Sequence, residues 1–220
     1  TVRLNRASIA KSQDPMMNRL SKKLSVCIYR IKHFLFKPQP FSPLPSTAIQ
    51  KTCAERLRAD MNRIPQDASA KPVNPSWHGF LSNLRGSAQS KDPIAFIEWP
   101  EVRKTMFYDA PLQEWKYLIR SPFWSVHRSA ILETAVGTPR PYIADPSTSG
   151  NLVQHAYHIA QLMEKCGADI SSMNDIVELG GGYGSMYRLV RHMGFAGEYT
   201  ILDLPEFLSL QRDSLSMIGL

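Results

Sequence analysis

Apolar positions recur every three or four residues in several parts of the chain. Over residues 19–37, lysine and arginine fill the positions between them, which predicts a basic amphipathic helix. Four prolines follow within residues 38–45. Because proline fixes φ and lacks an amide donor, this stretch is predicted as an extended linker. A helix with Ser46 as its cap is expected next. Residues 1–45 are thus interpreted as a basic arm and a linker.

The middle of the chain combines aromatic residues with prolines. Nine aromatic side chains lie between about residues 80 and 136, and four prolines interrupt the same stretch. This pattern predicts several short helices around an aromatic core. Stacking of nucleic-acid bases is the alternative use of such aromatics, and a core is favoured over it. Residues 46–145 are therefore assigned to a helical N-terminal region, and residues 137–150 are expected to be a loop.

A helix is predicted from about residue 151 to residue 165. Ser149 is the expected cap and Gly167 the expected terminator. His155 and His158 stand three positions apart on this helix, so both could face one site. No carboxylate completes a metal-binding set at a suitable spacing, so we expect no metal and assign the two histidines a structural or substrate-pocket role.

Residues 174–220 contain a regular alternation of elements. Ile176–Leu179 is a short apolar strand, and a glycine cluster follows it. An amphipathic helix comes next, then a second strand at Tyr199–Leu204 and a third helix that starts at Pro205. The order β-α-β-α predicts an α/β fold with parallel strands and right-handed crossovers.

The glycine cluster narrows the choice of ligand. The dinucleotide fingerprint GxGxxG fails in both registers, because Ser185 or Tyr187 stands where the third glycine is needed. What is present is an acid, Glu178, before the glycine loop 180–184, and a second acid, Asp203, 25 residues later. A tight turn without a ligand is the alternative for the glycines. The acids at these positions favour a ligand site.

This pattern resembles motif I and the following acidic motif of class I S-adenosylmethionine-dependent methyltransferases. The resemblance implies that Gly180, Gly181, Gly182, Tyr183 and Gly184 wrap the methionine and ribose portion of S-adenosyl-L-methionine. It further implies that Glu178 holds the amino-acid end of the cofactor and that Asp203 accepts hydrogen bonds from the ribose hydroxyls. Leu204 would border the adenine.

Residues 146–220 are similar, more narrowly, to a family of sugar O-methyltransferases. In that family, the segment that corresponds to Asn151, His155 and His158 lies beside the cofactor cleft, so these residues are candidates for substrate contacts. Gln154 stands where a second histidine is expected, which argues against a catalytic cluster. The resemblance implies a Rossmann-like methyltransferase domain of which this chain holds the first half, so we expect the chain alone to be inactive. No catalytic base is identified.

The net charge of +7 is concentrated at one end. Residues 1–40 hold nine lysines and arginines and one aspartate, and the other 180 residues hold 17 basic and 18 acidic residues. Nucleic-acid binding by the body of the protein is therefore not expected. The basic helix at 19–37 could lie on an anionic membrane or contact another protein or its own domain.

Three widely spaced cysteines and the lack of about 18 consecutive apolar residues favour a cytoplasmic protein, with peripheral membrane contact as a variant. The sequence thus predicts an O-methyltransferase for a small-molecule or saccharide hydroxyl. One alternative is a non-catalytic methyltransferase-like protein tethered by its arm. A weaker alternative is an NAD-dependent oxidoreductase.

Overall fold

The computed structural model describes residues 41, 46–65, 76–105 and 112–220. The chain divides into Thr1–Lys37 and Pro38–Leu220, and every described residue belongs to the second unit. The predicted basic helix and most of the predicted proline linker lie outside the described residues. Within the part that is described, no helix has the length and apolar character needed to cross a bilayer.

Four helices open the described chain. They are α2 (Ala48–Arg63), α3 (Ser76–Ser90), the 3₁₀ helix η1 (Pro93–Glu98) and α4 (Pro100–Thr105). The cap of α2 is Thr47 and not Ser46, so the prediction was wrong by one residue. The Thr47 hydroxyl accepts from the Gln50 amide at 3.2 Å, and the Thr47 amide donates to the Gln50 side chain at 3.0 Å. These two reciprocal hydrogen bonds form a capping box, which requires a glutamine or glutamate three residues after the cap. Thr47 has Gln50 at that position, whereas Ser46 has Ile49.

The aromatic region continues as short helices, as predicted. These are α5 (Leu112–Leu118), α6 (Pro122–His127) and the 3₁₀ helix η2 (Arg128–Ile131). The stretch 137–150 was expected to be a loop, and that prediction was wrong. It contains β1 (Pro141–Tyr142) and β2 (Asp145–Ser149), which pair antiparallel. The strands are short and polar, so only their pairing defines them, and no apolar alternation marks them in the sequence.

The long helix α7 (Gly150–Cys166) begins and ends as predicted. The Ser149 hydroxyl accepts from the Leu152 amide at 3.3 Å, and Gly167 adopts the left-handed conformation with φ +63°. The 3₁₀ helix η3 (Ile170–Ser172) then connects α7 to the first parallel strand.

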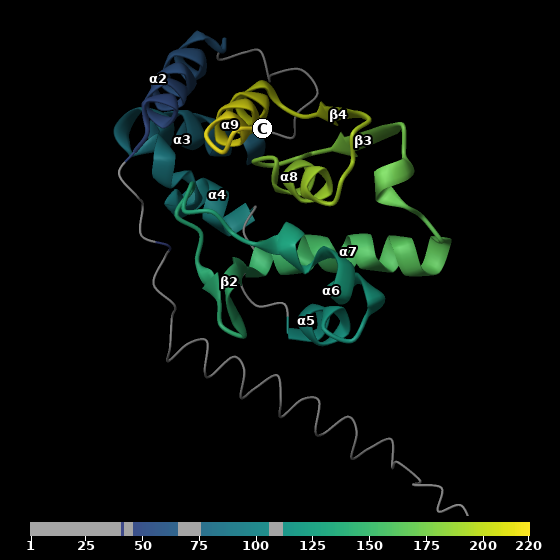
Figure 1. The fold of residues 1–220 in the computed structure, drawn as a ribbon. Helices are drawn as coiled ribbons and strands as arrows, with labels where there is room; N and C mark the ends of the chain where they lie inside the picture. Colours follow the sequence, from purple (N-terminus) through teal and green to yellow (C-terminus); the bar gives the residue numbers. More distant parts are fainter. Residues whose placement is uncertain (1–40, 42–45, 66–75, 106–111) are drawn as a thin grey trace, which may run out of the picture. The chain divides into compact units, whose positions relative to one another are not determined.

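The β-α-β-α prediction for the last segment is confirmed. β3 (Asp175–Leu179), α8 (Ser185–His192), β4 (Glu198–Leu202) and α9 (Pro205–Ser216) follow one another, and β3 and β4 are parallel (Figure 1). The chain therefore has an α/β fold in the described residues. β4 ends at Leu202, two residues earlier than predicted, so Asp203 lies in the loop after the strand.

Helix α9 joins the α/β segment to the helical region. It packs against α2 and α3 (Figure 1). Its side chains Phe207 and Leu210 share an apolar core with Leu57, Leu81 and Trp99. Two carboxylates of α9 are fully buried and paired. Asp213 accepts from Arg56 at 2.5 Å, and Glu206 accepts from the Nε of Arg85 at 2.9 Å. The core next to the glycine loop is thus built from the helical region and from the α/β segment.

Candidate functional site

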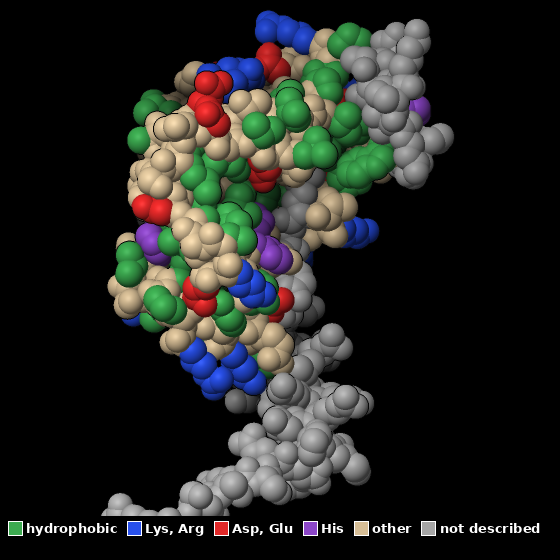
Figure 2. All heavy atoms as spheres, turned by 90° about the vertical axis from the view of Figure 1, so that its right-hand side faces the viewer, with side chains coloured by type: hydrophobic (Ala, Val, Ile, Leu, Met, Phe, Trp, Pro, Cys, Tyr) green, Lys and Arg blue, Asp and Glu red, His purple; other side chains and the backbone are tan. Residues whose placement is uncertain are grey.

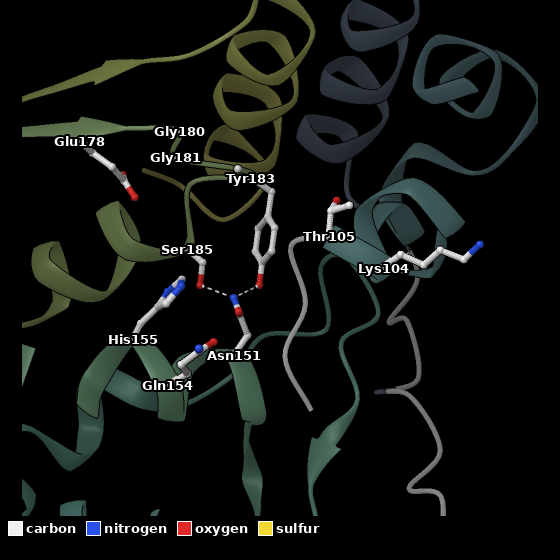
Figure 3. Close-up of a pocket in the computed structure, with 11 residues that line it drawn as sticks. Lys104, Thr105, Asn151, Gln154, His155, Glu178, Gly180, Gly181, Tyr183 and Ser185 are labelled. Carbon is white, nitrogen blue, oxygen red and sulfur yellow. Dashed lines mark hydrogen bonds between the residues drawn. The ribbon is translucent and has the colours of Figure 1, made fainter. Parts of the chain in front are cut away.

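A cavity of about 390 Å³ lies at the carboxyl end of β3 (Figure 3). This volume is within the usual range for a small-molecule site. One wall is the glycine loop, a second is the first two turns of α7, and the end of α4 completes the lining. The residues that line it are Lys104, Thr105, Asn151, Gln154, His155, Glu178, Gly180, Gly181, Gly182, Tyr183 and Ser185.

Glycine is required in the loop for two different reasons. Gly180, Gly182 and Gly184 have φ values of +76°, +60° and +86°, which residues with a side chain rarely adopt. At Gly181 the limit is space, because an added Cβ would stand 2.8 Å from Ile201 Cγ2. An added Cβ at Gly180 would meet nothing within 4 Å, so the backbone there borders open space.

Glu178 is the acid that faces the cavity. Its carboxylate accepts a hydrogen bond from the hydroxyl of Tyr199 at 2.8 Å. This bond links β3 to the neighbouring strand β4. Burial raises the pKa of Glu178, the bond from Tyr199 lowers it, and the nearby Asp203 carboxylate raises it. No pattern in the sequence marks Tyr199 as a partner of Glu178.

Asp203 does not line the cavity. Its carboxylate accepts from the amide of Gly182 at 3.2 Å, from the amide of Leu204 at 2.8 Å and from the side chain of Gln211 at 2.7 Å. It therefore braces the glycine loop against the start of α9. Burial raises the pKa of Asp203, and these hydrogen bonds oppose that rise.

Three further predicted residues also lie behind the cavity wall or away from it. Leu204 packs against the apolar core. Gly184 is the N-cap of α8, where an added Cβ would stand 2.9 Å from Leu215. His158 is exposed, and its ring contacts Tyr157. The expectation that His155 and His158 share one site is not met, because only His155 lines the cavity.

Asn151 connects the two main walls. Its amide nitrogen donates to the hydroxyl of Tyr183 at 2.6 Å and to the hydroxyl of Ser185 at 3.1 Å (Figure 3). Asn151 and Ser185 are both buried. Burial raises the pKa of Tyr183 well above its usual range, so its phenol stays neutral and can accept this bond. The start of α7 is thereby fixed to the loop that precedes α8.

His155 projects into the cavity region from the second turn of α7 (Figure 3). Its Nδ1 atom is buried and has no hydrogen-bond partner among the described residues. Burial, and to a smaller extent the neighbouring His158, lower the pKa of His155 to about 4. The imidazole is therefore uncharged at neutral pH.

Several lining residues were not identified from the sequence. Ser185 directly follows the glycine loop and could have been included for that reason. Lys104 and Thr105 come from α4, about 75 positions before the loop, and no sequence signal connects them to it. Among the residues that the structure describes, no group of three or more His, Cys, Asp or Glu side chains could hold a metal ion.

Comparisons of the chain with protein-family models, with curated proteins and with solved structures gave no match.

Proposed function

We propose that the cavity binds S-adenosyl-L-methionine and that the chain belongs to a Rossmann-like, class I O-methyltransferase. The observation that carries the proposal is the placement of Glu178 and the glycine loop on one cavity at the carboxyl end of a parallel strand. In open α/β sheets, ligands bind at that end of the strands. The proposed acceptor, a small-molecule or saccharide hydroxyl, follows from the resemblance described above.

The residues present suit this cofactor. The carboxylate of Glu178 would bind the ammonium group at the amino-acid end. Open space beside Gly180 lets the backbone approach a ligand closely, whereas the absence of a side chain at Gly181 lets the loop pack against Ile201 of β4. When bound, the cofactor supplies an electrophilic methyl group. The contribution of the protein is to hold an acceptor hydroxyl in line with it.

Asp203 could contact the ribose of the cofactor only to the extent that its carboxylate can still accept a hydrogen bond. A carboxylate has about four acceptor positions, and three hydrogen bonds already end on this one, with the Gly181 amide also lowering its pKa. A ribose hydroxyl would therefore have to replace one of these donors, such as the side chain of Gln211. The bracing bonds and the ribose bond therefore compete for the same two oxygen atoms.

Calorimetric titration of the 220-residue chain with S-adenosylhomocysteine tests the proposal. Glu178→Gln should weaken binding at least about tenfold, because a hydrogen bond to a charged group contributes about 1.5–3 kcal/mol. Glu198→Gln is the matched control, since Glu198 lies in the paired strand at the opposite end of the sheet and is exposed. It should leave the affinity unchanged.

Absence of binding by the wild-type chain would refute the proposal. So would equal losses in the two variants, because the cavity would then not be the binding site. Tighter binding of NADH than of S-adenosylhomocysteine would favour an oxidoreductase instead.

A further inference from the structure

The side chain of Gln211 occupies the carboxylate of Asp203. Its Nε2 atom donates to Oδ2 of Asp203 at 2.7 Å, and Gln211 is buried. The same nitrogen lies against the glycine loop, because an added Cβ at Gly181 would stand 3.3 Å from it. Gln211 belongs to α9 and not to the glycine motif or its two acids. Its contact with Asp203 is therefore a feature that the cofactor assignment leaves without a role.

The donors that hold Asp203 are all neutral. Figure 2 shows both acidic and basic side chains towards the upper edge of the face that lies on the right in Figure 1. The buried carboxylate of Glu206, for example, pairs with Arg85. Asp203 accepts instead from two backbone amides and from the side chain of Gln211. A neutral donor can be exchanged for another neutral donor at a much lower cost than the removal of a buried cation.

Of these donors, only Gln211 can leave without a change in the cavity wall. The amide of Leu204 adjoins Asp203 in the chain, and the amide of Gly182 belongs to the loop that lines the cavity. A shift of that loop would disturb its left-handed glycines. Gln211 holds its amide at the end of a side chain with three rotatable bonds. This amide can turn away while α9 and the loop stay in place.

A ribose hydroxyl is a suitable replacement for the Gln211 amide. Asp203 is only half-buried, so a ligand at the carboxyl ends of β3 and β4 can approach it. An O–H group donates one hydrogen bond, so the exchange leaves the carboxylate with the same number of donors. The exchange has a cost, because the released amide loses a bond to a charged group. A ligand without ribose hydroxyls would leave the Gln211 bond intact and would not meet this cost.

We propose that Gln211 is a competitor for the ribose position of Asp203, bonded to the carboxylate in the free protein and displaced when the cofactor binds. This inference rests on the proposed function, because it takes S-adenosyl-L-methionine as the ligand. Gln211 lowers the affinity for ligands that carry ribose hydroxyls. The sign of the effect distinguishes this role from simple support of the loop. Removal of a support weakens binding, whereas removal of a competitor strengthens it.

Calorimetric titration of the full chain compares two ligands and three proteins. The ligands are S-adenosylhomocysteine and its 2′,3′-dideoxy analogue, which lacks both ribose hydroxyls. The proteins are wild type, Gln211→Leu and the control Gln89→Leu. Leucine is close to glutamine in size but has no donor in its side chain. Gln89 is exposed on α3, and its side chain also donates a 2.7 Å hydrogen bond, to the carbonyl of Arg58.

Gln211→Leu should bind S-adenosylhomocysteine about three- to tenfold more tightly than wild type, because no hydrogen bond has to be broken first. Its affinity for the dideoxy analogue should stay within about twofold of wild type. Gln89→Leu should match wild type with both ligands. In ¹⁵N NMR of the wild-type chain, S-adenosylhomocysteine should move the side-chain amide signals of Gln211. The dideoxy analogue should leave them in place.

Other results overturn the inference. Equal or weaker binding of S-adenosylhomocysteine by Gln211→Leu would show that Gln211 supports the loop or plays no part. Equal gains with both ligands would show that the ribose hydroxyls are not involved. Should Gln211→Leu not fold, the wild-type spectra decide, and unmoved Gln211 signals at saturation refute the displacement. If wild type binds neither ligand, the proposed function fails and this inference fails with it. If wild type binds S-adenosylhomocysteine without a response of Gln211, only this inference is lost.

Discussion

The half-buried imidazole of His155, whose Nδ1 is fully covered, should make the stability of the protein depend on pH. Its pKa is lowered to about 4 by burial, and next by the positive charge of His158, whereas an unfolded histidine titrates near 6.5. Between these values the unfolded chain binds a proton at this residue and the folded chain does not. Unfolding is therefore favoured as the pH falls from about 6.5 towards about 4, and the full stability is present above about 6.5.

The size of the effect follows from the two pKa values. Their difference corresponds to about 3 kcal/mol, which is an upper figure because water in the cavity can solvate part of the ring. His158 on the same helix is the charged group that also lowers this pKa, whereas Lys104 and Glu178 line the same cavity at other walls.

Urea unfolding followed by circular dichroism at about pH 7 and about pH 4.5 measures this effect. Wild type should lose about 2–3 kcal/mol more than His155→Gln on acidification, because glutamine does not titrate. Other histidines whose pKa is lowered, such as His127 and His192, affect the stability of wild type and of His155→Gln equally. Their contributions therefore cancel when the two losses are compared. His78→Gln, in an exposed position on α3, is the control and should behave like wild type. Equal losses in wild type and His155→Gln would refute the argument.

Three further substitutions test the framework around the cavity. Arg85→Met should lower the free energy of unfolding by about 3–5 kcal/mol in a urea titration, because it leaves the fully buried carboxylate of Glu206 without this arginine. A loss below about 1 kcal/mol would contradict the buried pair. Gly197→Ala should cost about 3 kcal/mol or more in the same assay, since its Cβ would stand 2.1 Å from a backbone carbonyl oxygen ahead of β3. An unchanged free energy of unfolding would show that this contact is wrong. Tyr199→Phe should raise the pKa of Glu178 further, because the hydrogen bond that it removes lowers that pKa. Carboxyl ¹³C NMR measures the change, and an unchanged or lower pKa would contradict it.

The parts of the fold that depend on neighbouring residues could be predicted from the sequence. The cap at Ser149, the terminator at Gly167 and the β-α-β-α order all rest on contacts within a few positions. The β1–β2 pair was missed because its stability comes from strand pairing and not from an apolar pattern. Lys104 reaches the cavity only through the packing of α4, which no local pattern encodes.

The two histidines of α7 show a limit of helical spacing. Because an α-helix has 3.6 residues per turn, side chains three positions apart lie on the same side of the helix but point in different directions around its axis. That difference suffices here to put His155 on the cavity and His158 in solvent. A spacing rule therefore selects candidates for one site, but only the packing of the helix decides which of them reaches it.

The predicted cofactor residues divide by position into two groups. Glu178 and the loop up to Tyr183 line the cavity, whereas Asp203 supports the loop from behind, Gly184 caps α8 and Leu204 packs against the apolar core. The sequence cannot separate the groups, because a carboxylate accepts equally from a ribose hydroxyl and from a backbone amide. A loop of left-handed glycines needs such support, since glycine loses more conformational freedom on folding than other residues. Loss of ligand binding on substitution of Asp203 would thus have two explanations. Only a matched measurement of stability would separate a lost ribose contact from a collapsed loop.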